Sequence, residues 1–142
     1  MLDLFGMTSN YRIVIDRELK NANNGQTKHW GTSHRERQAW LRKVKDAYVV
    51  EPSGDEVMIN DFLESYQPPK YQGFLITRHL GKNQRYLDPD SVLRGNAKQL
   101  VDSLVEIGVA PDDSIKHLKF VIGLQCDKNR ELGPYTSVEV FS

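Results

Sequence analysis

A long apolar stripe between two strand-like runs is the feature that most limits the fold of this 142-residue chain. The stripe recurs at helical spacing and is followed by Gly108, which predicts a helix that ends at that glycine. Its members are Leu93, Ala97, Leu100, Val101, Leu104 and Val105. We expect the helix to begin near Asp88, because Pro89 suits a first helical turn. The flanking stretches 71–80 and 116–125 are rich in β-branched and aromatic residues, which predicts a strand on each side.

The remaining segments add two strands and two helices to this strand–helix–strand unit. Composition predicts strands over 11–19 and 135–141, and a polar stretch over 126–134 suits a hairpin loop between the last two strands. Apolar residues at helical spacing predict a helix over 34–48, and a short helix is expected over 55–66. A chain of this length suits one core. We therefore expect a single small α+β domain, with a mixed four-stranded sheet and helices packed on it.

Bulk composition excludes several classes of protein. The formal net charge is +0, so overall charge gives no support for nucleic-acid binding. The chain has a single cysteine, Cys126, which rules out an intramolecular disulfide and argues against a cysteine-based zinc site. The low cysteine content fits a reducing compartment. No apolar run approaches the roughly 20 residues of a membrane span, and the first residues do not resemble a secretory signal. These features predict a cytoplasmic protein that has no membrane partner.

A local basic cluster stands out against this neutral background. Between positions 28 and 45 six cations and one acid give a local charge of six minus one, or +5. Aromatic and histidine side chains are interleaved with the cations, a combination that suits contacts with nucleic-acid phosphates. The candidate DNA-binding residues are Lys28, Arg35, Arg37, Arg42 and Lys43. The alternative is an ordinary solvated face of a helix.

Two acid pairs flank the predicted central helix. Asp88 and Asp90 precede it, while Asp112 and Asp113 follow it. Carboxylate oxygens are the ligands that Mg²⁺ prefers, and a divalent ion can activate water for phosphodiester cleavage. The competing interpretation is structural, because aspartate is also a favoured helix cap and turn residue. From spacing alone, both interpretations stay open.

A cation near these acids would stabilise charge on a phosphate or orient the attacking water. Lys98 is the first candidate: on a continuous helix it would lie about 80° around the axis and roughly 12 Å along it from Asp90. Arg94, one turn after Asp90, is the alternative for the same position.

The stretch YLDPDSVLRGNAKQLVDSLVEIGVAPDDSIKHL resembles the signature of the RusA family of Holliday junction resolvases. The pieces that match are the paired aspartates at 88 and 90, Lys98, Asp102 with the following Ser-Leu, Gly108, and the Asp112–Asp113 pair before a strand. The resemblance covers about 34 residues strongly and the rest of the chain in element order. It implies a RusA-like fold in which residues 55–70 are a family-variable insert.

The resemblance also implies an activity and its residues. Members of the family act as homodimers that cut four-way DNA junctions with Mg²⁺. Carried over by position, Asp88, Asp90 and Asp113 would hold the metal and, with Lys98, would form the catalytic set; Asp112 is the fallback for the third ligand. Two departures bear on activity. The family's Asn after the second aspartate is Ser91 here, and the interval from Asp90 to Lys98 is four residues longer, so Lys98 is matched through its distance from Asp102.

Overall fold

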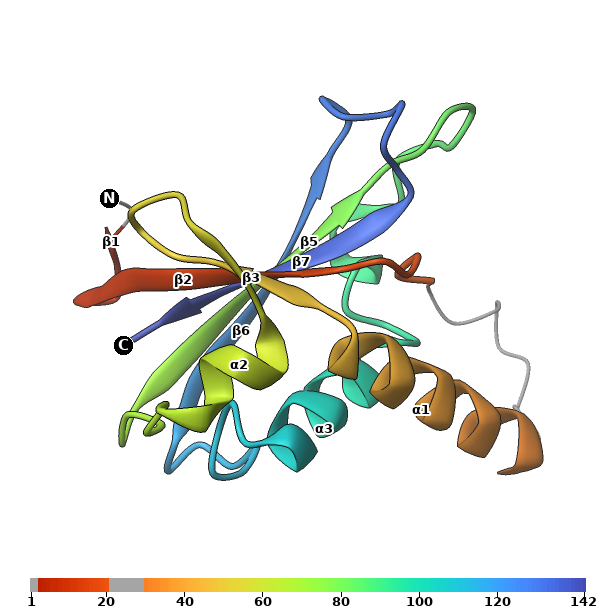
Figure 1. The fold of residues 1–142 in the computed structure, drawn as a ribbon. Helices are drawn as coiled ribbons and strands as arrows, with labels where there is room; N and C mark the ends of the chain where they lie inside the picture. The colour runs from red at the N-terminus through yellow and green to blue at the C-terminus, as the bar shows by residue number, and fades with distance from the viewer. Residues whose placement is uncertain (1–2, 21–29) are drawn as a thin grey trace.

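One mixed β-sheet organises the part of the chain that the structure describes, and the three α-helices found there lie on the same side of the sheet (Figure 1). The computed structural model describes residues 3–20 and 30–142. The strands are β1 (Asp3–Leu4), β2 (Met7–Ile15), β3 (Tyr48–Val50), β4 (Glu56–Met58), β5 (Gln72–His79), β6 (Leu118–Cys126) and β7 (Tyr135–Phe141). The predicted α+β class is confirmed, but the sheet has seven strands rather than four.

The order of strands across the sheet is β4-β3-β2-β7-β5-β6, and β1 pairs with β2 outside this path. Every pair of neighbours is antiparallel except β5 and β6, which run parallel. The hairpin predicted between the last two strands is wrong, because β7 lies between β2 and β5 and does not touch β6 as a ladder partner. Parallel strands need a long crossover connection, and the helix after β5 supplies it. β7 then returns to the middle of the sheet.

The helices are α1 (Trp30–Lys45), α2 (Ile59–Glu64) and α3 (Ala97–Ile107). The helix predicted over 34–48 exists, but it starts earlier and ends earlier, since the chain at Tyr48 enters β3. The helix predicted over 55–66 is shorter, because its first residues form β4. The strand predicted over 11–19 is shifted toward the N-terminus, and the strands β5, β6 and β7 lie close to their predicted positions.

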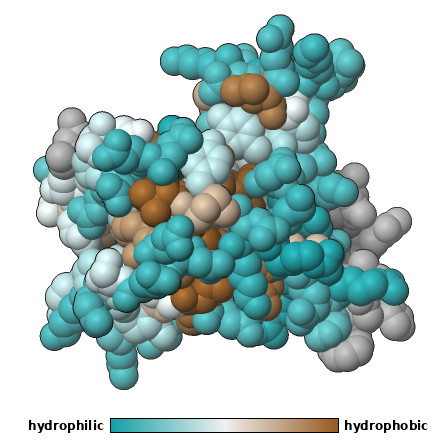
Figure 2. Space-filling model, viewed as in Figure 1, coloured by the Kyte–Doolittle hydropathy of each residue, from teal (hydrophilic) through white to brown (hydrophobic). Residues whose placement is uncertain are grey.

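The core lies between the helices and the sheet. Trp40 of α1 and Leu100 and Leu104 of α3 are fully buried against strand residues such as Ile13 and Phe74. Burial of each such side chain stabilises the fold by roughly 1.5–3 kcal/mol. On the surface seen in Figure 2, hydrophilic side chains surround apolar patches near the centre. The core thus fixes α1 and α3 on one face of the sheet, which positions the charged residues that these helices carry.

The connection from β5 to α3 differs from the prediction. The helix does not begin near Asp88; a single 3₁₀ turn, η1 (Pro89–Ser91), is followed by irregular chain until α3 begins at Ala97. Buried Asn96 explains the late start, because its side chain accepts a hydrogen bond from the backbone N–H of Lys20 and donates one to Glu36. These contacts tie the helix start to the segment that follows β2 and to α1. The predicted end is confirmed: Gly108 caps α3 with a left-handed φ of 97°.

Candidate functional site

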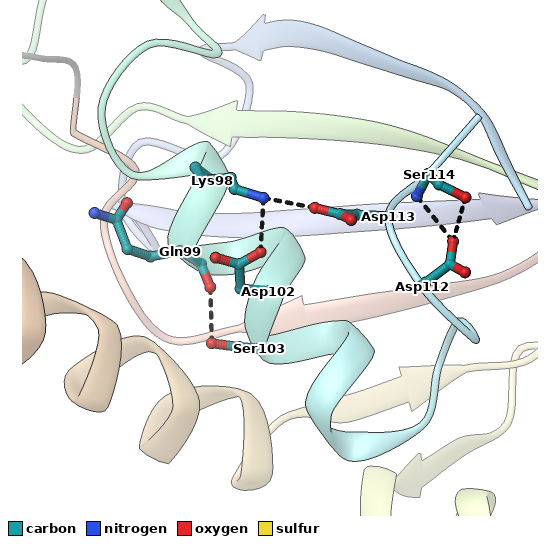
Figure 3. Close-up of polar contacts among 7 residues, drawn as sticks. All are labelled: Lys98, Gln99, Asp102, Ser103, Asp112, Asp113 and Ser114. Atoms are coloured by element: carbon teal, nitrogen blue, oxygen red, sulfur yellow. Dashed lines mark hydrogen bonds and ion pairs between the residues drawn. The ribbon is translucent and has the colours of Figure 1, made fainter. Parts of the chain in front are cut away.

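The β5–α3–β6 crossover carries the charged residues of the candidate site. Figure 3 shows Lys98 in the first turn of α3, with its ammonium group directed toward Asp113 in the loop that precedes β6. Lys98 Nζ lies 2.5 Å from Asp113 Oδ2 and 3.0 Å from Asp102 Oδ1. The crossover therefore joins two of the predicted site residues, Lys98 and Asp113, and adds a third residue, Asp102.

Hydrogen bonds within this cluster stabilise the charged forms of Lys98 and Asp113. The hydrogen bonds to Asp113 and Asp102 raise the pKa of Lys98 above its ordinary value. The hydrogen bond from Lys98 lowers the pKa of Asp113, so this carboxyl is held ionised. The Lys98 side chain is 67% exposed and the Asp113 side chain 44% exposed, so both remain open to a ligand from solvent. The cluster can present one cation and two carboxylates to a polar substrate.

Asp102 was matched to the family signature but was not predicted to be a site residue. It lies one helical turn after Lys98, and oppositely charged residues four apart on a helix are neighbours. That spacing alone was sufficient to predict the contact.

Asp112 has a structural task in the same loop. Its Oδ1 accepts hydrogen bonds from both the backbone N–H and the hydroxyl of Ser114, at 2.8 and 2.7 Å (Figure 3). These bonds lower its pKa, and His117 Nε2 lies 3.6 Å from its other oxygen. Such a pattern is an Asx turn, which fits the turn interpretation of this residue. Asp113, not Asp112, is the member of the pair that faces Lys98.

The first acid pair lies in the connection before α3. Asp88 occupies the cap position of the 3₁₀ turn in extended conformation, yet its side chain makes no capping hydrogen bond. The capping interpretation of Asp88 is therefore wrong for this structure. Asp90 is 72% exposed in its side chain and pairs with Arg94 at 3.1 Å. Arg94 thus pairs with Asp90, whereas Lys98 pairs with Asp113. The two candidate cations therefore contact different carboxylates.

The segments that carry the two acid pairs contact β6 at different positions. The side chain of Gln125 accepts a hydrogen bond from the Leu87 N–H and donates one to its carbonyl, which ties the residue before Asp88 to the carboxyl end of β6. Asp113 lies near the opposite end, in a shallow hollow that it shares with Lys98 and Leu118. Leu118 and Gln125 are seven positions apart, at opposite ends of this strand. Leu93, three residues after Asp90, lines the same hollow as Asp113, so the non-helical connection runs from one end of the strand toward the other.

The three candidate metal ligands lie on both sides of α3, Asp88 and Asp90 before the helix and Asp113 after it. Within residues 3–20 and 30–142 no three acidic, histidine or cysteine side chains form a group that could hold a metal ion. The donor chemistry nevertheless fits Mg²⁺: Asp88, Asp90 and Asp113 all supply exposed carboxylate oxygens. Lys98 and Arg94 contact two of these three carboxylates, and an ion would compete with them. The residues fit the ion by type.

The basic cluster lies largely on α1. Arg35, Arg37 and Arg42 are exposed on this helix, and Lys43 lies 3.8 Å from Asp16. Lys28 falls outside the described residues. Because α1 packs beside α3, Arg37 reaches the edge of a hollow that also contains Asp102, Glu106, Asp112 and Asp113. The basic face and the acidic cluster are therefore neighbours.

Comparison with known proteins does not assign the chain to a family. No family model matches its sequence, and no curated protein matches it significantly. In the described part of the chain, none of the helices has the length and apolar character needed to cross a membrane.

Proposed function

We propose that this chain is a Mg²⁺-dependent, structure-selective endonuclease that nicks four-way DNA junctions in recombination and repair. The observation that carries the proposal is the contact between Lys98 of α3 and Asp113 of the loop before β6. It brings together two residues, 15 positions apart in sequence, that the resemblance to the RusA resolvases assigns to one site. A cation beside an ionised carboxylate on an exposed surface suits phosphoryl chemistry.

Asp88, Asp90 and Asp113 would hold the metal ion. A bound Mg²⁺ would supply charge neutralisation at the phosphate and activation of water. Lys98 would contact the phosphate oxygen that gains charge, since its ammonium is exposed and held by two carboxylates on one side. Asp102 would keep the ammonium in position. Asp90 would exchange its contact with Arg94 for the ion.

The exposed arginines of α1 would bind the phosphates of the DNA arms. Arg35, Arg37 and Arg42 would anchor the backbone near the acidic cluster, because α1 and α3 pack side by side. Contacts with phosphates fix the position of a protein on DNA without reading bases, which suits recognition of branched shape. A homodimer would supply one site for each of two symmetry-related strands. A protein that acts on such DNA would work in the cytoplasm.

The test is a nicking assay on a labelled, mobile four-way junction with Mg²⁺. Paired, symmetric nicks are expected, and they should disappear with EDTA and in the Asp90→Asn variant. The Leu132→Ala variant is a matched control, because this exposed side chain lies in the β6–β7 loop, outside the candidate site. Failure of the wild-type protein to nick any branched DNA over a broad Mg²⁺ range would overturn the proposal.

A specific observation favours a second candidate function. The first acid pair and Asp113 form no common three-acid group in the described residues, and Ser91 stands where the resolvases have Asn. A weakened relative would bind branched DNA through α1 and cut it poorly. It would shift a junction in a gel without nicking, and Ser91→Asn would restore cutting if the missing amide is the cause.

A further inference from the structure

An exposed tyrosine with two lysines over its ring lies where β5 and β6 begin side by side (Figure 1). Tyr71 directly precedes β5 and is 44% exposed. Lys70 Nζ lies 5.3 Å and Lys119 Nζ lies 4.6 Å from the centre of the Tyr71 ring. Both lysines are exposed, and no carboxylate within residues 3–20 and 30–142 pairs with either ammonium. These three residues are called the Tyr71 patch.

A β-bulge gives Lys119 its place in this patch. Gln72 of β5 pairs with Leu118 of β6. The next residue, Gly73, pairs with Phe120, so Lys119 is an extra residue between the two pairs. Bulges redirect side chains, and they are rare between parallel strands. The backbone on both sides of Lys119 is held, because Leu118 is buried in the core and the Phe120 ring packs against Gly73. The irregular ladder thus directs this ammonium to the tyrosine ring.

The Tyr71 patch adjoins the loop before β6, which belongs to the candidate site. His117 of that loop has its Nδ1 at 3.1 Å from the carbonyl oxygen of Lys70 and its Nε2 at 3.6 Å from Asp112. Asp112 in turn borders the hollow that Arg37 of α1 also lines. The same loop therefore contacts the patch at one end and the hollow beside α1 at the other. The candidate site lies between two cationic surfaces, the arginines of α1 and the Tyr71 patch.

An exposed aromatic ring with two unpaired cations fits a single strand of nucleic acid. Proteins bind such strands by stacking bases on aromatic rings and by placing cations along the phosphates. A cation over an exposed ring gains little from that contact, so each ammonium can move to a phosphate and leave the ring to a base. An acidic peptide would match the two charges but would leave the ring without a stacking partner. The combination favours a nucleotide strand.

We infer that the Tyr71 patch binds an unpaired nucleotide of DNA, with the base stacked on Tyr71 and the flanking phosphates held by Lys70 and Lys119. The identity of the partner as DNA rests on the proposed function. The patch adds selectivity that the α1 arginines lack, because phosphate contacts form on any duplex. A base inside a continuous duplex is covered by its neighbours, whereas a base at a branch point can offer a free face. The patch would thus hold the branch beside the loop that carries Asp113.

The test measures binding of single strands in EDTA, so that its result is separate from that of the nicking assay. A short labelled oligothymidylate and an abasic strand of the same length carry the same phosphates, and the ratio of their Kd values measures stacking. Wild type should bind the oligothymidylate about tenfold more tightly. Tyr71→Ala should lose this preference. Tyr71→Phe, which keeps the ring, should retain it and shows that the effect is not one of folding.

A second variant tests the phosphate contacts. Lys119→Gln should weaken binding of both strands, and the slope of log K against log salt should fall in magnitude by about 0.7, as for the loss of one phosphate contact on a single strand. Lys128→Gln is the matched control, because this lysine is exposed in the β6–β7 loop, away from the patch. Its affinity and its salt slope should equal those of wild type.

The possible outcomes separate this inference from the proposed function. Tyr71→Ala that binds oligothymidylate as tightly as wild type would overturn the inference, and so would a wild-type protein that binds the abasic strand equally well. A polyglutamate peptide that displaces the oligothymidylate at equal concentration would assign the patch to an acidic partner instead. Junction nicking with no effect of Tyr71→Ala on strand binding would retain the proposed function alone. Strand binding lost in Tyr71→Ala, without nicking by wild type, would retain the inference alone.

Discussion

The acid pair before α3 and the acid pair after it are both exposed, yet they differ in what holds them. In the second pair, Asp112 is bonded to the chain at Ser114 and Asp113 is bonded to Lys98. In the first pair, Asp88 makes no capping bond and Asp90 contacts only the exposed Arg94 among the ion pairs described. The half of the candidate site near Lys98 is thus preorganised, and the half near Asp90 is held by a weak surface pair.

The difference has a physical origin in the connections. The loop after α3 runs over residues 108–117, from the Gly108 cap to the start of β6 at Leu118, and is shorter than the connection before the helix. The connection before α3 runs from Leu80 to Asn96, and its contacts with the rest of the molecule include those of Gln125, Arg130 and Asn96. Because Asp90 is held only by an exposed ion pair with Arg94, a bound cation would change the contacts of Asp90 most readily. Experiments that separate the two pairs test this comparison directly.

The largest expected effect is a difference in nicking rate between variants of Asp113 and of its neighbour Asp112. Asp113→Asn should reduce junction nicking by more than about a hundredfold, because even residues that only orient a metal ligand cost up to that much. Asp112→Asn is the matched control: its Oδ1 can still accept from Ser114, so nicking should change little. Single-turnover rates at saturating Mg²⁺ provide the measurement. Equal losses in the two variants would show that the loop has a structural function only.

The next effect is a difference in nicking rate between variants of the two candidate cations, Lys98 and Arg94. Lys98→Met should lower the single-turnover rate by about a hundredfold, as expected for loss of one group that stabilises transition-state charge. Arg94→Met removes an exposed ion pair with Asp90, and such pairs contribute under about 1 kcal/mol. Its nicking rate should therefore stay within a few-fold of wild type. A larger loss in Arg94→Met than in Lys98→Met would assign the catalytic cation to Arg94.

Strong local patterns predicted much of the fold. The apolar stripe and Gly108 located the body and end of α3, and β-branched runs located β5 and β7. The start of α3 was predicted wrongly because Asp88 and Pro89 form a good local start signal. The contacts of Asn96 with Lys20 and Glu36, 76 and 60 residues away, override that signal. No local pattern contains such contacts.

The same limit applies to the sheet and to the site. β3 and β4 have three residues each, too few for a clear alternation, and the place of β7 between β2 and β5 depends on long-range pairing. The sequence predicted Lys98 and Asp113 as candidate site residues, but their contact results from the β5–α3–β6 crossover. It also decides that Asp88 is tied to the far end of β6, because the Gln125 side chain holds Leu87.

The smallest expected effect concerns the contact between Lys98 and Asp113 and is measured without any substrate. The hydrogen bond from Lys98 depresses the pKa of Asp113, so Lys98→Met should raise this pKa toward that of an ordinary aspartate. Titration followed at the Asp113 carboxyl carbon by NMR gives the value in each variant. Arg94→Met is the control, since Arg94 contacts Asp90 and should leave the Asp113 midpoint in place.

The sign of the matching stability effect follows from linkage. A carboxyl whose pKa is lower in the folded state stabilises the fold above the unfolded-state pKa, and that stabilisation is lost as pH falls through the folded-state pKa. Wild type should therefore lose slightly more stability on acidification than Lys98→Met does, in the range below about pH 4 where aspartates titrate. An identical Asp113 midpoint in wild type and Lys98→Met would mean that the contact does not persist in solution. The second acid pair would then be no better organised than the first.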